Sequence, residues 1–140
     1  MTEACRFCEI VAGEVPAHFV VEEGPVRAFL DHHPIFPGHT LVVPERHVEH
    51  LNVMPDALVE PFWRTVRAVS RALVDGLGAT GTFTATNTIV SQSVPHLHAH
   101  VVPRRRKDGL RGFFWPRTRY ASDAEAAGVA TVLRAAVVVL

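Results

Sequence analysis

The sequence carries no excess of either charge, since 14 Lys and Arg residues face 14 Asp and Glu residues. The overall charge therefore predicts no nucleic acid partner. No apolar run has the length of a membrane span, because residues 135–140 are far fewer than the roughly 20 that a spanning helix needs. The N-terminal residues lack the basic and apolar regions of a signal peptide. We expect a cytosolic protein that does not enter a membrane.

The sequence is also poor in cysteine, with only Cys5 and Cys8. Cytosolic thiols stay reduced, so a structural disulfide is not expected. A C-x-x-C pair is typical of half a metal site, of a redox motif, or of two ordinary thiols. The redox interpretation requires a surrounding β-α-β pattern, which the sequence does not show. A zinc site requires two more ligands, and the chain has nine histidines to supply them.

No internal repeat or low-complexity stretch divides the chain. With 140 residues, 48% of them hydrophobic, it is predicted to form a single domain over residues 1–140. Within it, residues 104–140 form a basic, aromatic-bearing tail that includes Trp115 and a last helix opened by a capping box at 122–125. The basic residues of this tail indicate a solvated face, or a surface that steers an anionic substrate inward. Those that cluster in residues 104–119 are Arg104, Arg105, Arg106, Lys107, Arg111, Arg117 and Arg119.

Hydrophobic periodicity predicts the other elements. Two apolar runs flanking Glu-Gly-Pro predict a hairpin over residues 18–31. Residues 39–44 and 82–87 are predicted strands. Apolar residues spaced by three and four predict an amphipathic helix over 56–78, with Pro61 in an early turn and glycines at its end.

Three histidines recur at every second position in the segment from His96 to Val102. Strict alternation is typical of a strand with one buried face, so His96, His98 and His100 should line the opposite face. Three such side chains span roughly 13 Å and converge poorly on one metal ion, whereas an extended phosphate chain matches them better. The spacing therefore favours a phosphate-bearing substrate.

Further polar residues border this predicted strand. Asp31 ends the hairpin and is either a turn carboxylate or an acceptor for sugar hydroxyls. Asn87, Gln92 and Ser93 lie in the turn that leads to the histidines, where turn chemistry explains them and substrate contact is the alternative. Three more histidines are candidate ligands or ordinary surface and core residues: His39, His47 and His50.

The sequence strongly resembles the histidine triad (HIT) family of nucleotide hydrolases and transferases. The family signature, three histidines separated by apolar residues, is met by residues 96–102, and the resemblance covers nearly the whole chain. The bacterial branch, with its Hint-type phosphoramidases and dinucleoside polyphosphate hydrolases, is the most similar. Motifs at four other places fall in family order: residues 5–16, 29–31, 38–47 and 87–93.

The resemblance implies an α+β fold, with a five-stranded antiparallel sheet and helices packed on it. It also implies a homodimer in which the sheet continues across both subunits. His98 takes the position of the nucleophile, flanked by His96 and His100, and His39 that of a supporting histidine. Asp31 matches the position that accepts the ribose hydroxyls. The positions near the scissile phosphate are matched by Asn87, Gln92 and Ser93.

These residues support a covalent mechanism without a catalytic metal. An imidazole with one free ring nitrogen is a good nucleophile near neutral pH, and we expect a backbone carbonyl to hold the other N–H. His98 then attacks the α-phosphorus of a purine nucleotide, and water hydrolyses the nucleotidyl-histidine. Some relatives carry a structural zinc, and the matching ligands are Cys5, Cys8, His47 and His96, with His50 as the alternative to His47.

The leading hypothesis is therefore a hydrolase acting on a nucleoside phosphoramidate, an acyl-adenylate or a dinucleoside polyphosphate. One alternative is a nucleotide-binding module with little turnover. The other is a phosphorylase or transferase, although uridylyltransferases typically have Gln where this chain has His100.

Overall fold

The computed structural model describes residues 4–111 and 116–139. Met1–Asp108 and Gly109–Leu140 form two compact units. The elements of the first unit are α1 (Arg6–Val11), β1 (Phe19–Val21), β2 (Val26–Leu30), β3 (Thr40–Pro44), the 3-10 helix η1 (Leu51–Val53), α2 (Asp56–Leu77), β4 (Gly81–Ala85) and β5 (Ala99–Arg104). The second contains α3 (Asp123–Ala136). None of the helices among the described residues has the length and apolar character needed to cross a membrane.

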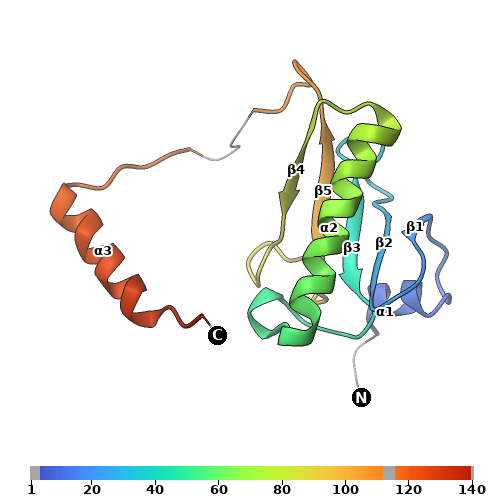
Figure 1. The fold of residues 1–140 in the computed structure, drawn as a ribbon, viewed down its shortest axis with the longest axis horizontal. Helices are drawn as coiled ribbons and strands as arrows, with labels where there is room; N and C mark the ends of the chain where they lie inside the picture. Colours follow the sequence, from blue (N-terminus) through green and yellow to red (C-terminus); the bar gives the residue numbers. More distant parts are fainter. Residues whose placement is uncertain (1–3, 112–115, 140) are drawn as a thin grey trace. The chain divides into compact units, whose positions relative to one another are not determined.

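The five strands form one antiparallel sheet in the order β1-β2-β3-β5-β4 (Figure 1). The predicted α+β fold is confirmed, including the hairpin over 18–31 and the strands near 39–44 and 82–87. β5, from the C-terminal part of the fold, inserts between β3 and β4 and so lies in the interior of the sheet.

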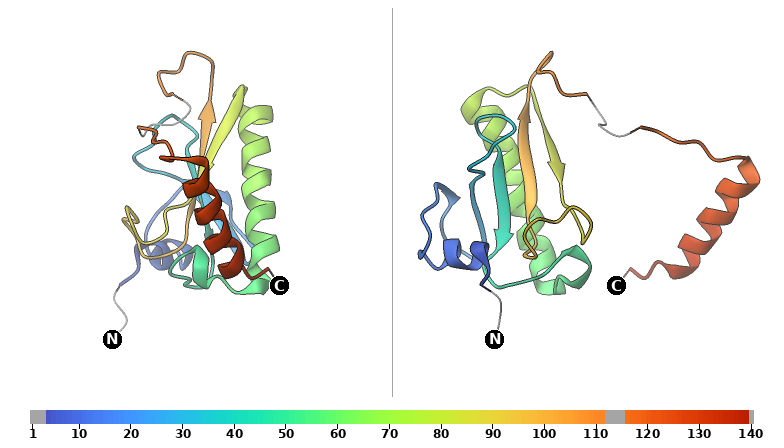
Figure 2. Two further views of the ribbon diagram at one scale, coloured as in Figure 1. Left: turned by 90° about the vertical axis from the view of Figure 1, so that its left-hand side faces the viewer. Right: turned by 180° about the vertical axis from the view of Figure 1, so that it is seen from behind.

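Helix α2 packs on one face of the sheet and α1 on the other (Figures 1 and 2). The alternation of each strand divides the core: Ala28, Val42 and Val101 face α2, whereas Phe29 and Leu41 pack with α1. Because successive strand side chains point to opposite faces, His100 of β5 lies on the face away from α2. The sheet therefore places the histidines on the α1 side.

The long helix follows the prediction closely. Pro61 lies in its second turn without ending it, and Gly78 caps it in the left-handed conformation, at φ 69°. In α3, Ser122 accepts a hydrogen bond from the Glu125 amide, as predicted. The Glu125 carboxylate accepts from Ala121 rather than from the N-cap amide itself.

The strand predicted from His96 begins only at Ala99. The backbone amide of Leu97 donates to the carbonyl of Val48, at 2.6 Å, and Val48 lies in a loop. His96 donates to Val94 within its own turn. The first two histidines are thus fixed by loop contacts, while His100 alone belongs to the strand.

Candidate functional site

His98 is held by its own chain. Its Nδ1 lies 2.8 Å from the carbonyl oxygen of His96. A carbonyl only accepts, so Nδ1 carries the proton and Nε2 of the neutral ring keeps its lone pair. This confirms the expectation that a backbone carbonyl holds one N–H. Only 5% of the residue is exposed, and its ring meets Phe7 edge-on at 5.0 Å between centroids.

His100 and His39 form a hydrogen-bonded pair beside His98. Nε2 of His39 lies 2.9 Å from Nδ1 of His100, and the His98 and His100 ring centroids are 5.1 Å apart. His39 is 3% exposed, and its Nδ1 accepts from the amide of Ile35, at 3.0 Å. The structure thus brings together three of the four predicted catalytic histidines.

Burial controls the charge of these rings. It lowers the pKa of His100 to about 4, helped by the neighbouring His98 and His39 and opposed by Asp31. Burial also lowers the pKa of His98 and of His39, against the opposing influence of Asp31 and, for His98, of the His96 carbonyl. All three rings are therefore neutral at pH 7, the state in which imidazole is a nucleophile or a donor.

Asp31 lies at the end of β2, where its backbone amide donates to the carbonyl of His39. Its Oδ1 accepts from the amide of His33, at 2.9 Å, and its Oδ2 lies 3.6 Å from Nε2 of His39. The predicted sugar acceptor therefore does adjoin the histidines. A partly exposed carboxylate, with 16% of its side chain accessible, is available to hydroxyl groups.

The loop before the histidines is held by its own polar residues. Gln92 donates to the carbonyl of Glu49 and accepts from the amide of Ile89. Asn87 donates to the carbonyl of Ser91, at 3.3 Å. Ser93 is exposed. Turn chemistry thus accounts for Asn87 and Gln92, and substrate contact by any of these three residues stays a prediction.

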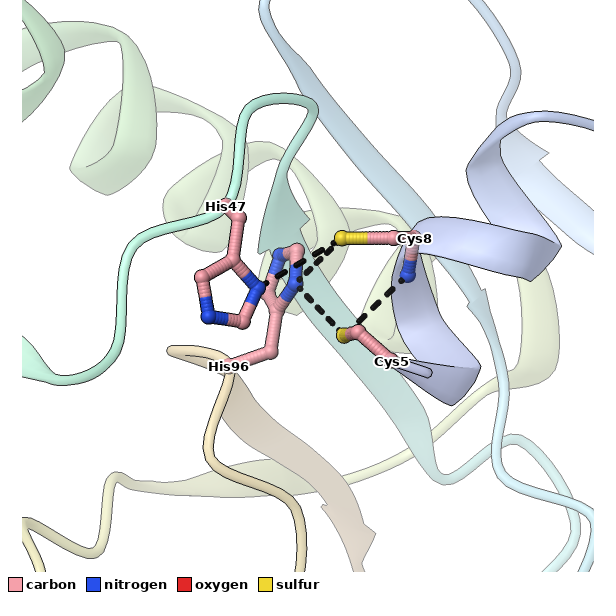
Figure 3. Close-up of side chains that lie close together, drawn as sticks. All are labelled: Cys5, Cys8, His47 and His96. Carbon is pink, nitrogen blue, oxygen red and sulfur yellow. Dashed lines mark hydrogen bonds between the residues drawn. The ribbon is translucent and has the colours of Figure 1, made fainter. Parts of the chain in front are cut away.

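The ring nitrogens of His96 contact groups other than the His39–His100 pair. Its Nε2 is 2.9 Å from the carbonyl of Pro44, which leaves the lone pair on Nδ1. That Nδ1 lies 3.3 Å from the sulfur of Cys5 and 3.5 Å from that of Cys8 (Figure 3). Both ring nitrogens are occupied, so the ring of His96 has no nitrogen left for a phosphate. A catalytic role for His96 stays a prediction; the contact that it makes with the other two histidines of the motif is the hydrogen bond from His98 to its carbonyl.

The two cysteines, His47 and His96 form a four-residue group whose ligand atoms lie within 4.8 Å of one another. Nδ1 of His47 lies 3.5 Å from the Cys8 sulfur. Burial, together with Cys5 and Glu9, raises the pKa of Cys8 to about 11, so two thiolates need a cation between them. Two sulfurs and two imidazole lone pairs are the donor set of a tetrahedral zinc site. His50 is outside this group, so His47 fits better than its alternative.

The basic tail begins with structural arginines. Arg104 pairs with Asp108, with Nε–Oδ2 at 2.6 Å, and Arg105 donates to the carbonyls of Leu77 and Gly78 at the end of α2. The ion pair with Asp108 offsets the charge of Arg104, whereas the hydrogen bonds to carbonyls leave Arg105 cationic, and substrate steering by the tail stays a prediction. Phe113, Phe114 and Trp115 lie outside the described residues.

Two surface hollows lie outside the histidine cluster. One, of about 400 Å³, includes Phe36, Arg106 and Lys107. The other, of about 490 Å³, is apolar and runs between α2 and the ends of β2 and β3. Neither is lined by the three histidines or Asp31.

Sequence reasoning missed three groups of the site: the amide of Ile35, the carbonyl of Pro44 and the ring of Phe7. The first two are backbone groups, and the residue type at a position does not indicate what its backbone will contact. Phe7 lies inside the C-x-x-C segment, and an apolar residue there is the one signal that could have indicated packing against the histidines.

Comparison with curated proteins finds relatives over most of the chain. A Bacillus subtilis protein named hit is 37% identical over 115 residues, which are 81% of this chain and 79% of the relative. An adenosine 5'-monophosphoramidase of Candida albicans is 29% identical over 81% of this chain and 78% of its own length. An adenylylsulfatase of Arabidopsis thaliana is 31% identical over 76% of this chain and 55% of its own length.

Solved structures show the same fold. The crystal structure of a HIT family member from Bacillus subtilis has a TM-score of 0.87 and 30% identity, covering 99% of this chain and 100% of that one. A zinc-bound histidine triad protein from Mycobacterium smegmatis has a TM-score of 0.73 and 33% identity, covering 94% and 97% of the two chains. A family model described as the HIT domain matches residues 12–107. Since that match spans well over half of the 140 residues, this chain belongs to the HIT domain family.

Proposed function

We propose that this protein is a nucleotidyl hydrolase that cleaves at the α-phosphate of a purine nucleotide through a covalent nucleotidyl-His98 intermediate. One observation carries the proposal: the Nδ1 of His98 is bonded to the His96 carbonyl, which leaves Nε2 as an unprotonated nitrogen beside His100. The names of two relatives, a monophosphoramidase and an adenylylsulfatase, support this class of reaction.

The reaction proceeds by two displacements at phosphorus. Nε2 of His98 attacks the α-phosphorus in line, a P–N bond forms, and the bond to the amine, carboxylate, sulfate or nucleotide leaving group breaks with its electron pair, the amine taking up a proton from solvent as it leaves. Water then attacks the same phosphorus and gives up a proton to solvent, and the P–N bond breaks with its electron pair returning to His98, which departs as a neutral ring. The His96 carbonyl stabilises the Nδ1–H of His98, which becomes more acidic when Nε2 carries the phosphoryl group.

Asp31 and His100 orient the substrate in this proposal. The Asp31 carboxylate accepts the ribose hydroxyls, and His100 contacts the phosphate oxygens, where preorganised donors stabilise developing charge. Fixed donors are worth more here than in water because the site is largely buried. The reaction as proposed uses no metal for catalysis.

A structural zinc is part of the proposal, held by Cys5, Cys8, His47 and His96. Bound there, zinc supplies a crosslink between α1, the segment after β3 and the segment before β5, and the zinc-bound relative supports it. His96 ties this crosslink to the active site because its carbonyl holds His98. Free thiols also suit the reducing cytosol that we propose as the location.

The test replaces His98 with Ala or Gly and measures turnover of adenosine phosphoramidate, an acyl-adenylate and diadenosine polyphosphates. We expect kcat to fall by at least about 10³-fold, with nucleotide binding retained, because only the nucleophile is lost. His18→Ala is the matched control, since His18 is an exposed histidine outside the site. Undiminished turnover in His98→Gly would remove His98 from the mechanism.

The same assay separates the alternatives. A binding module leaves every substrate intact. A phosphorylase run in phosphate buffer releases a nucleoside diphosphate, whereas a hydrolase releases the monophosphate with one oxygen from solvent.

A further inference from the structure

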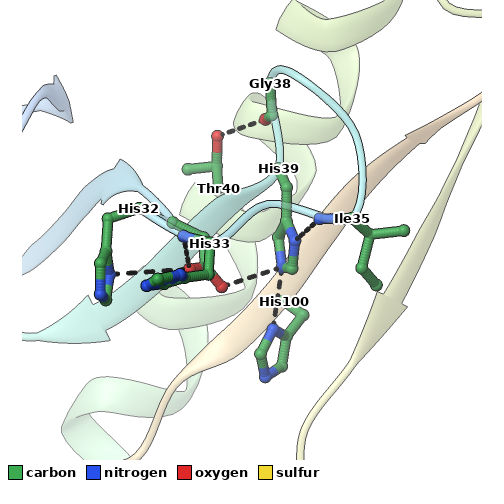
Figure 4. A network of polar contacts seen from close by, with 8 residues as sticks. His32, His33, Ile35, Gly38, His39, Thr40 and His100 are labelled. Atoms are coloured by element: carbon green, nitrogen blue, oxygen red, sulfur yellow. Dashed lines mark hydrogen bonds and ion pairs between the residues drawn. The ribbon is translucent and has the colours of Figure 1, made fainter.

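The loop between β2 and β3, residues 31–39, places a backbone amide behind the catalytic histidines. The amide of Ile35 donates to Nδ1 of His39, at 3.0 Å, and the other nitrogen of that ring contacts His100 (Figure 4). Ile35 itself is exposed, with half of its surface accessible, so its side chain is not what the site uses.

An amide donor determines which nitrogen of His39 carries the proton. A backbone N–H cannot accept, so Nδ1 of His39 must offer a lone pair, and the proton of the neutral ring lies on Nε2. The opposite tautomer would set two N–H groups against each other. The loop therefore selects the Nε2–H form of His39.

The tautomer of His39 in turn determines the tautomer of His100. Nε2–H of His39 donates to Nδ1 of His100 across 2.9 Å, a normal hydrogen-bond length. The competing acceptor, Oδ2 of Asp31, is 3.6 Å away and too distant for a good bond. With its Nδ1 accepting, neutral His100 carries its proton on Nε2, on the far side of the ring from His39.

The chain of donors requires both rings to be neutral, and burial provides this. It lowers the pKa of His100 to about 4 and lowers that of His39 as well. At pH 7 each ring therefore has one proton, and the hydrogen bonds decide where it lies.

A metal ion is the other interpretation of this cluster, because Asp31, His39 and His100 offer three ligand atoms within 4.8 Å. A metal between the rings would require lone pairs on both facing nitrogens. The Ile35 amide disfavours that state, since it already occupies the Nδ1 lone pair of His39 and leaves the proton on the facing Nε2. The donor chain accounts for every nitrogen of His39 without an ion.

We propose that the backbone amide of Ile35 is a positioning group for catalysis: acting through His39, it holds His100 in the tautomer that presents Nε2–H to the substrate phosphate. The role of the phosphate rests on the proposed function, whereas the tautomers are a property of the protein alone. In the opposite tautomer, His100 would present a lone pair to an anionic oxygen. His100 would then repel the phosphate oxygen instead of donating a hydrogen bond to it, although the charge and shape of the ring would be unchanged.

The direct test is the protonation state of the two rings in the wild-type protein at pH 7. Long-range ¹H–¹⁵N correlation spectra of ¹⁵N-histidine-labelled protein distinguish the tautomers, with His39→Asn and His100→Gln used for assignment. We expect Nε2–H on both His39 and His100. Nδ1–H on either ring, or a metal-bound spectrum for His39, overturns the proposal.

A proline substitution removes the amide hydrogen. In Ile35→Pro, His39 loses its donor, and its spectrum should change to the Nδ1–H form or a mixture. Ile35→Ala keeps the amide and should keep the wild-type spectrum. An unchanged His39 tautomer in a folded Ile35→Pro protein contradicts the proposal.

A second pair of variants keeps the test decisive if proline disrupts the loop. In His39→Gln, the amide nitrogen can reach the place of Nε2 and donate to His100, whereas the shorter Asn side chain mimics only the Nδ1 end. We expect His39→Asn to lower kcat about 10- to 100-fold with a smaller change in KM, and His39→Gln to recover most of that loss. Equal losses of kcat in the two variants overturn the proposed hydrogen-bond relay from Ile35 through His39 to His100.

The outcomes separate this proposal from the proposed function. Predicted tautomers in a protein that turns over no nucleotide would leave the relay standing and end the assignment of the reaction. Turnover that depends on His98, with Nδ1–H on His39, would support the assignment of the reaction and overturn the relay.

Discussion

His96 shows how much one residue can organise at this site. Its Nε2–H donates to the Pro44 carbonyl, its Nδ1 faces the two sulfurs, and its own carbonyl holds His98. The three contacts link the end of β3, the start of α1 and His98. Of the three histidines in the motif, this one contacts the two cysteines and the end of β3, and the other two lie at the proposed site of the reaction.

The buried, neutral state of His100 makes stability depend on pH. Its folded pKa of about 4 lies below the ordinary value near 6.5, so between these values the unfolded chain binds more protons. The stability contributed by neutral His100 is complete above about pH 6.5 and is lost as pH falls toward 4. The free energy of unfolding of the wild type should therefore fall between pH 7 and 4.5. We predict that in His100→Gln this fall is smaller by about 2 kcal/mol.

Urea denaturation at a series of pH values measures this difference. His18→Ala, which changes an exposed histidine, should keep the wild-type slope. If the unfolding free energy depends on pH equally in His100→Gln and the wild type, His100 has an ordinary pKa in the folded protein.

At the scale of elements, the turn entering β3 depends on one glycine. Gly38 has a φ of 103°, and a Cβ there would meet Cδ1 of Leu77 at 2.7 Å and Cδ2 of Leu73 at 3.2 Å. Both are flexible side-chain ends, so the clash is partly relieved by movement of α2 side chains. Leu73 is buried and has less freedom than the exposed Leu77.

We predict that Gly38→Ala destabilises the protein by about 2 kcal/mol, from backbone strain and from this crowding. Gly13→Ala is the matched control, because Gly13 also has a positive φ, 81°, but no atom lies within 4 Å of its added Cβ. It should cost only about 1 kcal/mol, the strain alone. A smaller loss for Gly38→Ala than for Gly13→Ala, in denaturant unfolding, would contradict the packing described here.

The short helix α1 is predicted to depend on the metal site. Cys5 is both its N-cap, accepting from the Cys8 amide, and a proposed zinc ligand. We predict one zinc per chain by elemental analysis, falling close to zero in Cys8→Ser, with Tm lowered by several degrees because α1 loses its crosslink. Cys5→Ser can still cap the helix and separates capping from metal binding. A protein purified without zinc, and with an unchanged Tm in Cys8→Ser, would refute the zinc assignment.

At the scale of the whole molecule, periodicity predicted the hairpin, the strands near 39–44 and 82–87 and the long helix, whereas the five-stranded antiparallel sheet was implied by the resemblance to the family. The order of the strands and the division of the core were not predicted. The alternation of residues 96–102 identified the face that carries the histidines, although the strand starts at Ala99 because Leu97 pairs with a loop. The contacts that determine the tautomers could not be predicted. They come from the amide of Ile35 and the carbonyls of Pro44 and His96, whose positions depend on tertiary structure and not on residue type. The single-domain assignment of 1–140 stays a prediction.

The homodimer also stays a prediction, and the sheet suggests its geometry. β4 is an edge strand of five residues, whereas the other edge, β1, has three and an irregular register. We predict a solution mass about twice 15.4 kDa, with the sheet continued through β4. Hydrogen exchange should then protect every amide of residues 81–85. Fast exchange at alternate β4 amides would indicate that this edge is free.

In the proposed reaction the nucleotide becomes covalently bonded to His98. Rapid-quench mass spectrometry during turnover of adenosine phosphoramidate tests it most directly, because an adduct formed before hydrolysis can be mapped to one peptide. We predict an adenylyl group on the peptide containing His98, appearing within one turnover and absent from His98→Gly. Full turnover with no adduct at any time, or an adduct on another residue, would contradict it.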